Sequence, residues 1–203
     1  MKAIVSKKSG PPSVLKLEDV PKPIPKQNEI LVKVSASTVT RGDVFLRKLP
    51  RFVQLPMGLL FGFKVMEITG VEFAGEVKKV GSLVTIFKDG DHVFGTTTGL
   101  KYGGNAEYVC VPEERKSGVV IKKPENISFN EAAAIPVGAM TALHLLRKGE
   151  VTLGHKVLIY GASGSVGTYA VQLAKYFGAE VTGICSTMNI EMVKTLGADN
   201  VID

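Results

Sequence analysis

The chain has 203 residues, of which 45% are hydrophobic and 22% charged, a balance typical of a globular protein with a sizeable core. Its net charge of +6 favours acidic or phosphorylated ligands, but Lys and Arg are scattered, so we expect no nucleic-acid binding. The apolar segment Phe52–Met66 is short and interrupted by Pro, Gly and polar residues, so we expect no membrane span. The two cysteines are far apart and the chain begins directly with a strand pattern, which indicates a cytoplasmic protein with reduced thiols.

Up to about Lys123 the sequence predicts short strands separated by Gly and Pro. The β-branched runs bounded by turn residues are Val14–Val20, Glu29–Ser35, Thr69–Val80, His92–Thr98 and Ala106–Val111. A short helix is expected at Arg41–Lys48, where Asp43 and Arg47 have the spacing of an ion pair along one helix face.

From Ser128 onward the pattern becomes that of alternating helices and strands. Ser128 with Glu131 three residues later predicts a capping box, and Ala132–Ala134 and Val137–Arg147 are expected to be helical. The segments that follow predict β-α-β-α-β with short links, the order of a parallel doubly wound sheet. They are the strand Lys156–Tyr160, the helix Val166–Phe177, the strand Glu180–Cys185, a helix near Ile190–Leu196 and a strand from Asn200.

These patterns predict an α/β plus β protein, with residues 1–125 as a β-rich domain and residues 126–203 as part of a Rossmann-type nucleotide-binding domain. Such a sheet is built from two βαβαβ halves, and the chain contains the first, so we expect a truncated second domain. Its unpaired edge favours a homodimer. Little or no activity is expected of 203 residues alone.

The strongest local motif is the glycine-rich turn that follows the strand Lys156–Tyr160. Gly164 lets the backbone approach a pyrophosphate, and Gly167 lets the next helix pack close to the strand. Ala162 occupies the first glycine position of the usual fingerprint. The amides at the start of the helix would bind the phosphates of a dinucleotide.

The end of the second strand distinguishes NAD from NADP. An acidic residue there would bind the ribose 2′-hydroxyl of NAD and repel a 2′-phosphate, but Gly183–Asn189 contains no acid. Small hydroxyl residues in this segment can bind a phosphate, although no Arg is present. The sequence therefore favours NADP(H) over NAD(H).

Several motifs along the whole chain resemble the zinc-independent medium-chain dehydrogenases/reductases, the quinone oxidoreductase and zeta-crystallin family. The motifs are Gly70–Val77, Asp89–Gly95, Gly103–Val109, Ala132–Pro136 with Thr141-Ala142, and the glycine turn. The resemblance implies a GroES-like substrate domain followed by the Rossmann-type domain, with an active site in the cleft between them.

The resemblance also implies individual cofactor residues. The positions that contact the cofactor in relatives are Thr141, Ser163, Gly164, Ser165 and Val166, to which the turn itself adds Gly167. Ser186 matches a serine that contacts the 2′-phosphate, whereas Met188 stands where relatives have an arginine.

Zinc is not expected. At the positions that match the cysteine and histidine ligands of the zinc-dependent branch, this chain has Thr40 and Val71, and its three histidines are spread along the sequence. At the substrate end, Thr40 is a candidate donor to a carbonyl oxygen, or equally a helix cap. Phe45 would shape the pocket, and the segment Phe52–Met66 would be a lid or, preferably, pack on the core or on a subunit.

We therefore expect an NADPH-dependent reductase of small apolar quinones or α,β-unsaturated carbonyl compounds, acting without zinc. Two alternatives remain from the sequence: an enoyl-thioester reductase, and a non-catalytic nucleotide-binding or structural protein on the same scaffold.

Overall fold

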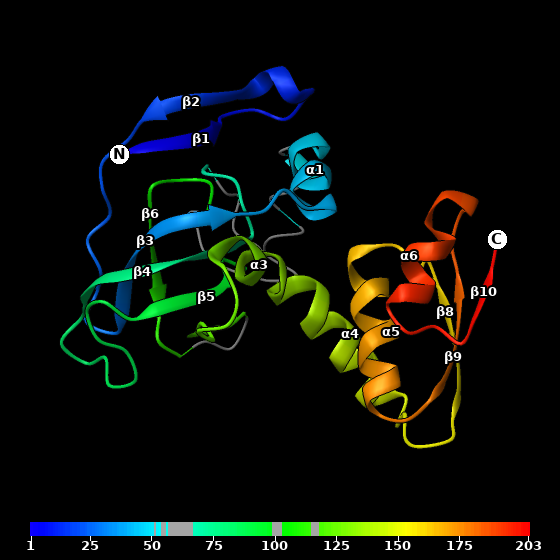
Figure 1. Cartoon of the computed structure of the whole chain (residues 1–203). Helices are drawn as coiled ribbons and strands as arrows, with labels where there is room; N and C mark the ends of the chain where they lie inside the picture. The colour runs from blue at the N-terminus through cyan, green and yellow to red at the C-terminus, as the bar shows by residue number, and fades with distance from the viewer. Residues whose placement is uncertain (51, 54–55, 57–66, 99–102, 115–117) are drawn as a thin grey trace. The chain divides into compact units, whose positions relative to one another are not determined.

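The computed structural model describes residues 1–50, 52–53, 56, 67–98, 103–114 and 118–203 (Figure 1). The chain divides into two compact units, Met1–Pro136 and Val137–Asp203, each with its own hydrophobic core. Most of the segment Phe52–Met66, expected to be a lid or a packed loop, lies outside the described residues.

The first unit is built on a curled antiparallel sheet of five strands. In spatial order these are β6 (Tyr108–Pro112), β3 (Glu29–Ser37), β4 (Glu72–Val80), β5 (His92–Thr96) and β7 (Val120–Lys122). Apolar residues alternate along the strands, so one side of the sheet encloses a core that includes Ile30, Val32, Phe73, Val77 and Val109. Two register shifts in the pairing of β3 with β4 are consistent with the bending of the sheet.

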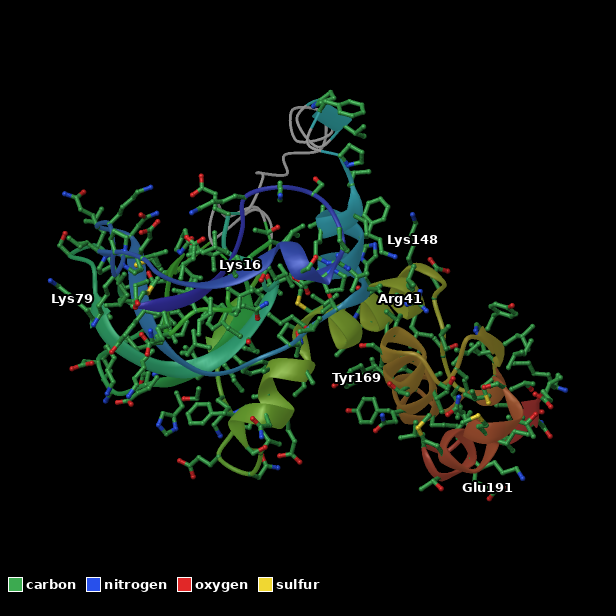
Figure 2. The ribbon with its side chains drawn as sticks, turned by 90° about the horizontal axis from the view of Figure 1, so that it is seen from above. Lys16, Arg41, Lys79, Lys148, Tyr169 and Glu191 are labelled. Carbon is green, nitrogen blue, oxygen red and sulfur yellow. The ribbon has the colours of Figure 1, made fainter. Side chains whose placement is uncertain are left out.

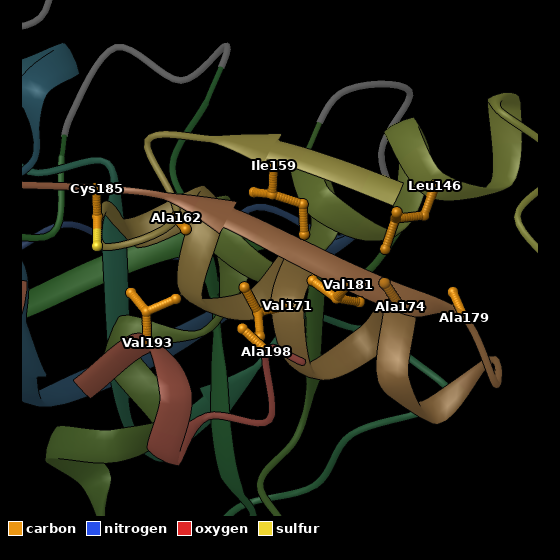
Figure 3. Close-up of a cluster of buried hydrophobic side chains, with 10 residues drawn as sticks. All are labelled: Leu146, Ile159, Ala162, Val171, Ala174, Ala179, Val181, Cys185, Val193 and Ala198. Carbon is orange, nitrogen blue, oxygen red and sulfur yellow. The ribbon is translucent and has the colours of Figure 1, made fainter. Parts of the chain in front are cut away.

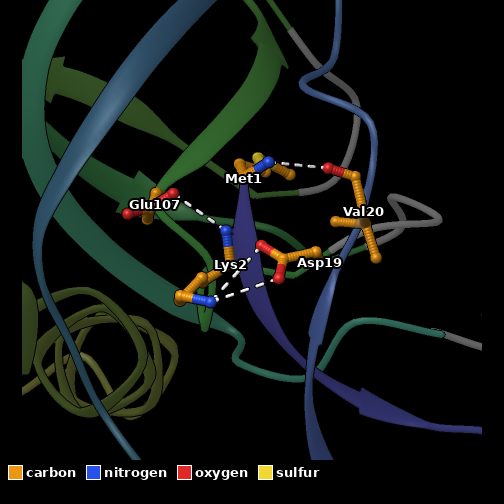
Figure 4. A network of polar contacts seen from close by, with 5 residues as sticks. All are labelled: Met1, Lys2, Asp19, Val20 and Glu107. Carbon is orange, nitrogen blue, oxygen red and sulfur yellow. Dashed lines mark hydrogen bonds and ion pairs between the residues drawn. The ribbon is translucent and has the colours of Figure 1, made fainter.

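A separate pair of antiparallel strands, β1 (Lys2–Ser6) and β2 (Leu15–Asp19), is linked through the short helix η1 (Pro12–Val14). Polar contacts fix the start of the chain (Figure 4). The amino group of Met1 donates to the Val20 carbonyl over 2.8 Å, and the Lys2 amide donates to Glu107 over 2.8 Å. The N-terminus is therefore tied to a segment more than a hundred residues away.

The helix α1 (Arg41–Lys48) has the predicted bounds, but the predicted Asp43–Arg47 pair is wrong. The Asp43 carboxylate accepts hydrogen bonds from Thr40 and from the Gly70 amide, at 2.8 and 3.0 Å. The Arg47 guanidinium donates to the Gly10 carbonyl. Both side chains therefore tie α1 to neighbouring loops, because these contacts satisfy more backbone groups than a pair on the helix surface would.

The helix α3 (Phe129–Ala134) begins with the predicted capping box, in which the Ser128 hydroxyl accepts from the Glu131 amide and the Glu131 carboxylate accepts from Ser128. The next helix, α4 (Pro136–Lys148), starts at a proline, which suits the first turn because no amide is needed there.

The second unit contains a parallel sheet in the order β10-β9-β8, with β8 (Lys156–Tyr160), β9 (Glu180–Ile184) and β10 (Asn200–Ile202). The connecting helices are α5 (Ser165–Tyr176), η2 (Thr187–Asn189) and α6 (Ile190–Thr195). Side chains from α4, α5 and α6 pack on one face of the sheet, around Val171, Val181 and Val193 (Figure 3). On the alternate strand positions Leu158, Tyr160 and Ile202 are exposed. This face therefore has no cover within the described residues of the second unit.

Several bounds differ from the sequence prediction by one to three residues, and one strand was not predicted. The strand expected from Thr69 starts at Glu72, because the backbone of Thr69 and Gly70 bonds to Asn105, Ile4 and Gly104 instead of extending the β4 ladder. The strand expected to reach Thr98 ends at Thr96. The short edge strand β7 was not predicted.

Charged side chains project from both units, among them Lys16, Arg41, Lys79, Lys148 and Glu191 (Figure 2). In the part of the chain that the structure describes, no helix is both long enough and apolar enough to cross a bilayer.

Candidate dinucleotide-binding site

The turn between β8 and α5 is tight and rests on glycine. Gly161 has φ +74°, a backbone conformation that costs other residues energy, and its carbonyl accepts from the Gly164 amide over 2.9 Å. Ala162 is fully buried beneath the turn, and its amide donates to the Ile184 carbonyl of β9. The turn is therefore anchored to the carboxyl ends of both strands.

Gly167 is needed for the helix to approach the strand. A Cβ atom at this position would lie 2.2 Å from the Gly161 carbonyl oxygen and 2.8 Å from the Ala162 Cα, closer than any real contact. A Cβ atom at Gly164 would have the Gly161 carbonyl oxygen as its nearest neighbour, 3.3 Å away. Gly167 thus serves the packing of α5 on β8, whereas Gly164 leaves the outer side of the turn open.

The N-terminus of α5 has free hydrogen-bonding capacity. Gly164 is the N-cap, so no side chain caps the helix, and the bond from the Thr168 amide to the Gly164 carbonyl is 2.8 Å long. The amides of Ser165, Val166 and Gly167 precede that bond and have no acceptor four residues back within the helix. Three donors and the positive end of the helix dipole are well suited to a diphosphate.

The end of β9 is joined to this turn by a side chain that the sequence reasoning did not select. The amide nitrogen of the Asn189 side chain donates to the Ser186 hydroxyl over 3.0 Å and to the Ser163 hydroxyl over 3.3 Å. Ser163 lies in the glycine turn, and Ser186 precedes η2. Two of the predicted cofactor residues, 23 positions apart in the sequence, are thereby brought to one place.

The predicted residue Met188 lies in η2 with 93% of its surface exposed. Two described acidic residues lie near Met188, Glu191 in the sequence and Asp203 at the end of β10, and both already have a polar partner. Glu191 pairs with Lys194 at 3.1 Å, and the Asp203 carboxylate accepts from the Thr187 hydroxyl at 2.5 Å.

Thr141 lies on α4 and is exposed. Gly138, one turn earlier on the same helix face, lies against α5, since a Cβ there would be 2.6 Å from the Ser165 hydroxyl oxygen. Thr141 therefore lies one turn beyond a point where α4 is packed against the beginning of α5. Together with the residues of the turn and of η2, all eight predicted cofactor positions lie in the second unit.

The two predicted substrate residues, Thr40 and Phe45, lie in the first unit. Thr40 is the N-cap of α1: its hydroxyl accepts from the Asp43 amide over 3.2 Å and donates to the Asp43 carboxylate over 2.8 Å. The single hydroxyl proton is thus engaged within the cap. The side chain of Phe45, on α1, is 56% exposed.

Asp43 also brings Thr40 next to the second position at which the zinc-dependent branch has a ligand. Its carboxylate bonds to Thr40 and to the amide of Gly70, the residue before Val71. A threonine and a valine supply no thiolate or imidazole for zinc. Among the residues that the structure describes, no group of three or more His, Cys, Asp and Glu side chains could hold a metal. Burial raises the pKa of the Cys110 thiol to about 12, which disfavours the thiolate that a metal would need.

A comparison with known proteins first identifies the class of the first domain. Residues 26–125 match the alcohol dehydrogenase GroES-like domain, in agreement with the curled antiparallel sheet. The chloroplast envelope quinone oxidoreductase homolog of Arabidopsis thaliana is 40% identical over 194 residues, which are 91% of this chain and 55% of that protein. The NADPH-dependent alkenal/one oxidoreductase of the same plant is 35% identical over 212 residues, covering 100% of this chain and 52% of the relative.

A solved structure agrees with the sequence relatives. The quinone oxidoreductase from Coxiella burnetii superimposes with a TM-score of 0.88 at 36% identity, over 100% of this chain and 62% of that one. The domain match and these relatives support the family that the motifs predicted, the quinone oxidoreductases of the medium-chain dehydrogenases/reductases. It spans about half the length of the curated relatives that it matches.

Proposed function

We propose that the chain is the GroES-like domain and the first part of the cofactor domain of an NADPH-dependent oxidoreductase that reduces quinones or α,β-unsaturated carbonyl compounds without zinc. The observation that carries the proposal is the uncapped N-terminus of α5 behind the turn at Gly161–Gly167. The names of the relatives support the two substrate classes, and one of them supports NADPH.

When bound, NADPH would supply the hydride. The residues of this chain bind and orient it: the amides of Ser165–Gly167 hold the diphosphate, and the hydroxyls of Ser163 and Ser186 lie where a 2′-phosphate is expected. Because no acid stands in Gly183–Asn189, nothing in that segment repels such a phosphate.

The substrate is proposed to be a small apolar carbonyl compound or quinone. Reduction needs a proton as well as a hydride, and Thr40 remains the candidate donor of a hydrogen bond to the substrate oxygen. Because its proton is engaged with Asp43, that role requires the Thr40 hydroxyl to exchange one acceptor for another. Water can supply the proton itself.

The test is direct. The full-length polypeptide is titrated with NADPH and with NADH while the nicotinamide fluorescence is followed, and the loss of NADPH absorbance is then measured with a small quinone and with an enone. Saturable binding of NADPH and turnover of either substrate are expected. Failure to bind either coenzyme would rule out the proposal, and binding without turnover would favour the non-catalytic alternative.

A cytoplasmic location and a homodimer, both expected from the sequence, stay predictions. The curated relatives include proteins named as chloroplastic and mitochondrial.

A further inference from the structure

Asn189 makes an unusual pair of contacts in the second unit. Its side-chain amide nitrogen donates to two serine hydroxyl oxygens, Ser163 at 3.3 Å and Ser186 at 3.0 Å. The backbone supports this arrangement, because the Asn189 backbone amide donates to the Ser186 carbonyl over 2.8 Å and closes η2. Asn189 is half-buried, whereas Ser186 is exposed.

The count of protons decides what the two hydroxyls can do. An amide NH₂ group has two hydrogens, which is enough for one bond to each of the two serine oxygens. A serine hydroxyl that accepts through one lone pair keeps its own proton for another acceptor. Neither Ser163 nor Ser186 donates its hydroxyl proton to any residue within the described ranges. Both hydroxyls are therefore set as donors, and the incoming amide bonds polarise them further in that direction.

We propose that Asn189 is a positioning residue for the 2′-phosphate of NADPH: it orients the hydroxyls of Ser163 and Ser186 as a pair of donors that takes the place of the arginine replaced by Met188. This inference rests on the proposed function and adds the residue that sets coenzyme preference. A phosphate monoester has only acceptors on its outer oxygens, so two prepared donors match it. A ribose 2′-hydroxyl can both donate and accept, and it gains much less from donors fixed in advance.

The described residues around Ser186 include one exposed methionine, one ion pair and one carboxylate. Met188 is 93% exposed and adds no charge, Lys194 is paired with Glu191, and Asp203 accepts from Thr187. Because the described residues next to Ser186 and Asn189 in the sequence supply no unpaired cation, we expect the pair to discriminate through the number and direction of its protons. We therefore expect a moderate preference for NADPH, below that given by a bidentate arginine.

The experiment compares the dissociation constants of NADPH and NADH, and of the fragments adenosine 2′,5′-bisphosphate and 5′-AMP, for the full-length protein and its variants. Asn189→Leu has a similar volume and removes both donated bonds. We expect it to weaken the binding of the two 2′-phosphorylated ligands about five- to thirty-fold and to leave NADH and 5′-AMP within about twofold. Gln172→Leu removes the same amide group on the exposed side of α5 and is the control. It should change neither the ratio of the dissociation constants of NADPH and NADH nor that of adenosine 2′,5′-bisphosphate and 5′-AMP.

Asn189→Asp tests the direction of the protons. The carboxylate would accept both hydroxyl protons and add a negative charge, so the loss for NADPH should exceed that of Asn189→Leu. Ser186→Ala should weaken NADPH binding in the native background and have a smaller effect in the Asn189→Leu background, because the two residues act together.

The outcomes separate this inference from the proposed function. If wild-type protein binds neither coenzyme, the proposed function fails. If it binds NADPH but Asn189→Leu lowers the affinity for NADPH and NADH equally, or changes neither, the positioning role of Asn189 is wrong while the proposed function stands.

Discussion

Gly164 and Gly167 stand three residues apart in one turn, yet the space around them differs. An added methyl group at Gly167 would meet backbone atoms at 2.2 and 2.8 Å, whereas at Gly164 it would meet only a carbonyl oxygen at 3.3 Å. We predict that Gly167→Ala lowers the free energy of unfolding by about 1–3 kcal/mol, since strand and helix must move apart. Urea denaturation of Gly167→Ala, compared with that of Gly164→Ala, measures the difference in the free energy of unfolding.

Gly164→Ala should change stability by less than about 1 kcal/mol but weaken the binding of both nicotinamide coenzymes about tenfold or more, because its methyl group would stand on the open side of the turn. Equal losses of stability in the two variants would contradict the separate roles that the structure gives them.

The position of Thr40 at the N-cap of α1 allows its two proposed roles to be separated. Thr40→Val keeps the shape and loses the hydroxyl that accepts from the Asp43 amide, so it should cost about 1 kcal/mol of stability. Thr40→Asn keeps a good cap. If the hydroxyl also binds the substrate oxygen, Thr40→Ser should retain turnover and Thr40→Val should lower kcat about tenfold or more.

Two measurements on Thr40→Val are compared with those on the native protein: the kcat with a quinone and the urea unfolding curve. A stability loss with unchanged kcat would leave Thr40 as a cap alone.

At the level of the elements, local patterns predicted most of the second unit. The bounds of β8 were predicted from an apolar run that ends at Gly161, and the start of β10 from the residues after Gly197. Both predictions were correct because the strand and turn signals lie within a few residues of each other. The capping box at Ser128 was likewise a signal of four residues. Such features depend little on the rest of the chain.

Features that depend on distant residues were missed. The start of β4 at Glu72 is set by the loop contacts of Thr69 with Asn105 and of Gly70 with Gly104, which lie 36 and 34 residues further along the chain. The short strand β7 exists because β5 offers an edge. The bridge from Asn189 to Ser163 spans 26 positions, and only the resemblance of Ser186 to a serine in relatives pointed toward this part of the chain.

Asp199, the residue before β10, links α5 to β9, and its contacts predict that the stability of the second unit falls in acid. Its carboxylate accepts from Lys175 of α5 at 2.8 Å and from the Val181 amide of β9 at 2.6 Å. The Lys175 side chain, followed by the Val181 amide, lowers the pKa of Asp199 below its ordinary value of 3.8. Because the folded-state pKa is the lower one, the contribution to stability is complete above the ordinary value and is lost as the pH falls through the folded value.

We therefore expect Asp199→Asn to be less stable than the native protein at neutral pH, with the difference between the two shrinking as the pH falls below about 4. Urea denaturation at a series of pH values measures this. A constant difference between the two proteins across the acid range would show that the loss in Asp199→Asn is steric or due to the altered hydrogen bond, and not to the charge.

At the scale of the whole molecule, charge and core are divided between the two units. Residues 1–136 carry 20 Lys and Arg against 14 Asp and Glu, whereas residues 137–203 carry five of each. The entire net charge of +6 therefore belongs to the first unit. Because the second unit has no net charge, we infer that a diphosphate would be bound there through oriented amides and hydroxyls more than through a general positive field.

The hydrophobic clusters divide in the same way, and this leads to a prediction about fragments. Among the residues that the structure describes, three clusters lie within residues 1–136 and one lies within residues 137–203, with no residue in common. The fragment 1–136 should fold alone and unfold cooperatively. The fragment 137–203 is small, and its sheet has helices on one face only, with Leu158 63% and Tyr160 87% exposed on the other.

We expect the fragment 137–203 to bind a hydrophobic dye and to self-associate. One face of its sheet exposes apolar side chains, and the edge of β8 exposes unpaired backbone groups. Circular dichroism during urea titration, dye fluorescence and sedimentation of the two fragments measure this. Replacing Leu158 and Tyr160 with serine should reduce dye binding and association of the fragment 137–203. A cooperative, monomeric fragment that excludes the dye would show that one covered face is enough to stabilise this sheet.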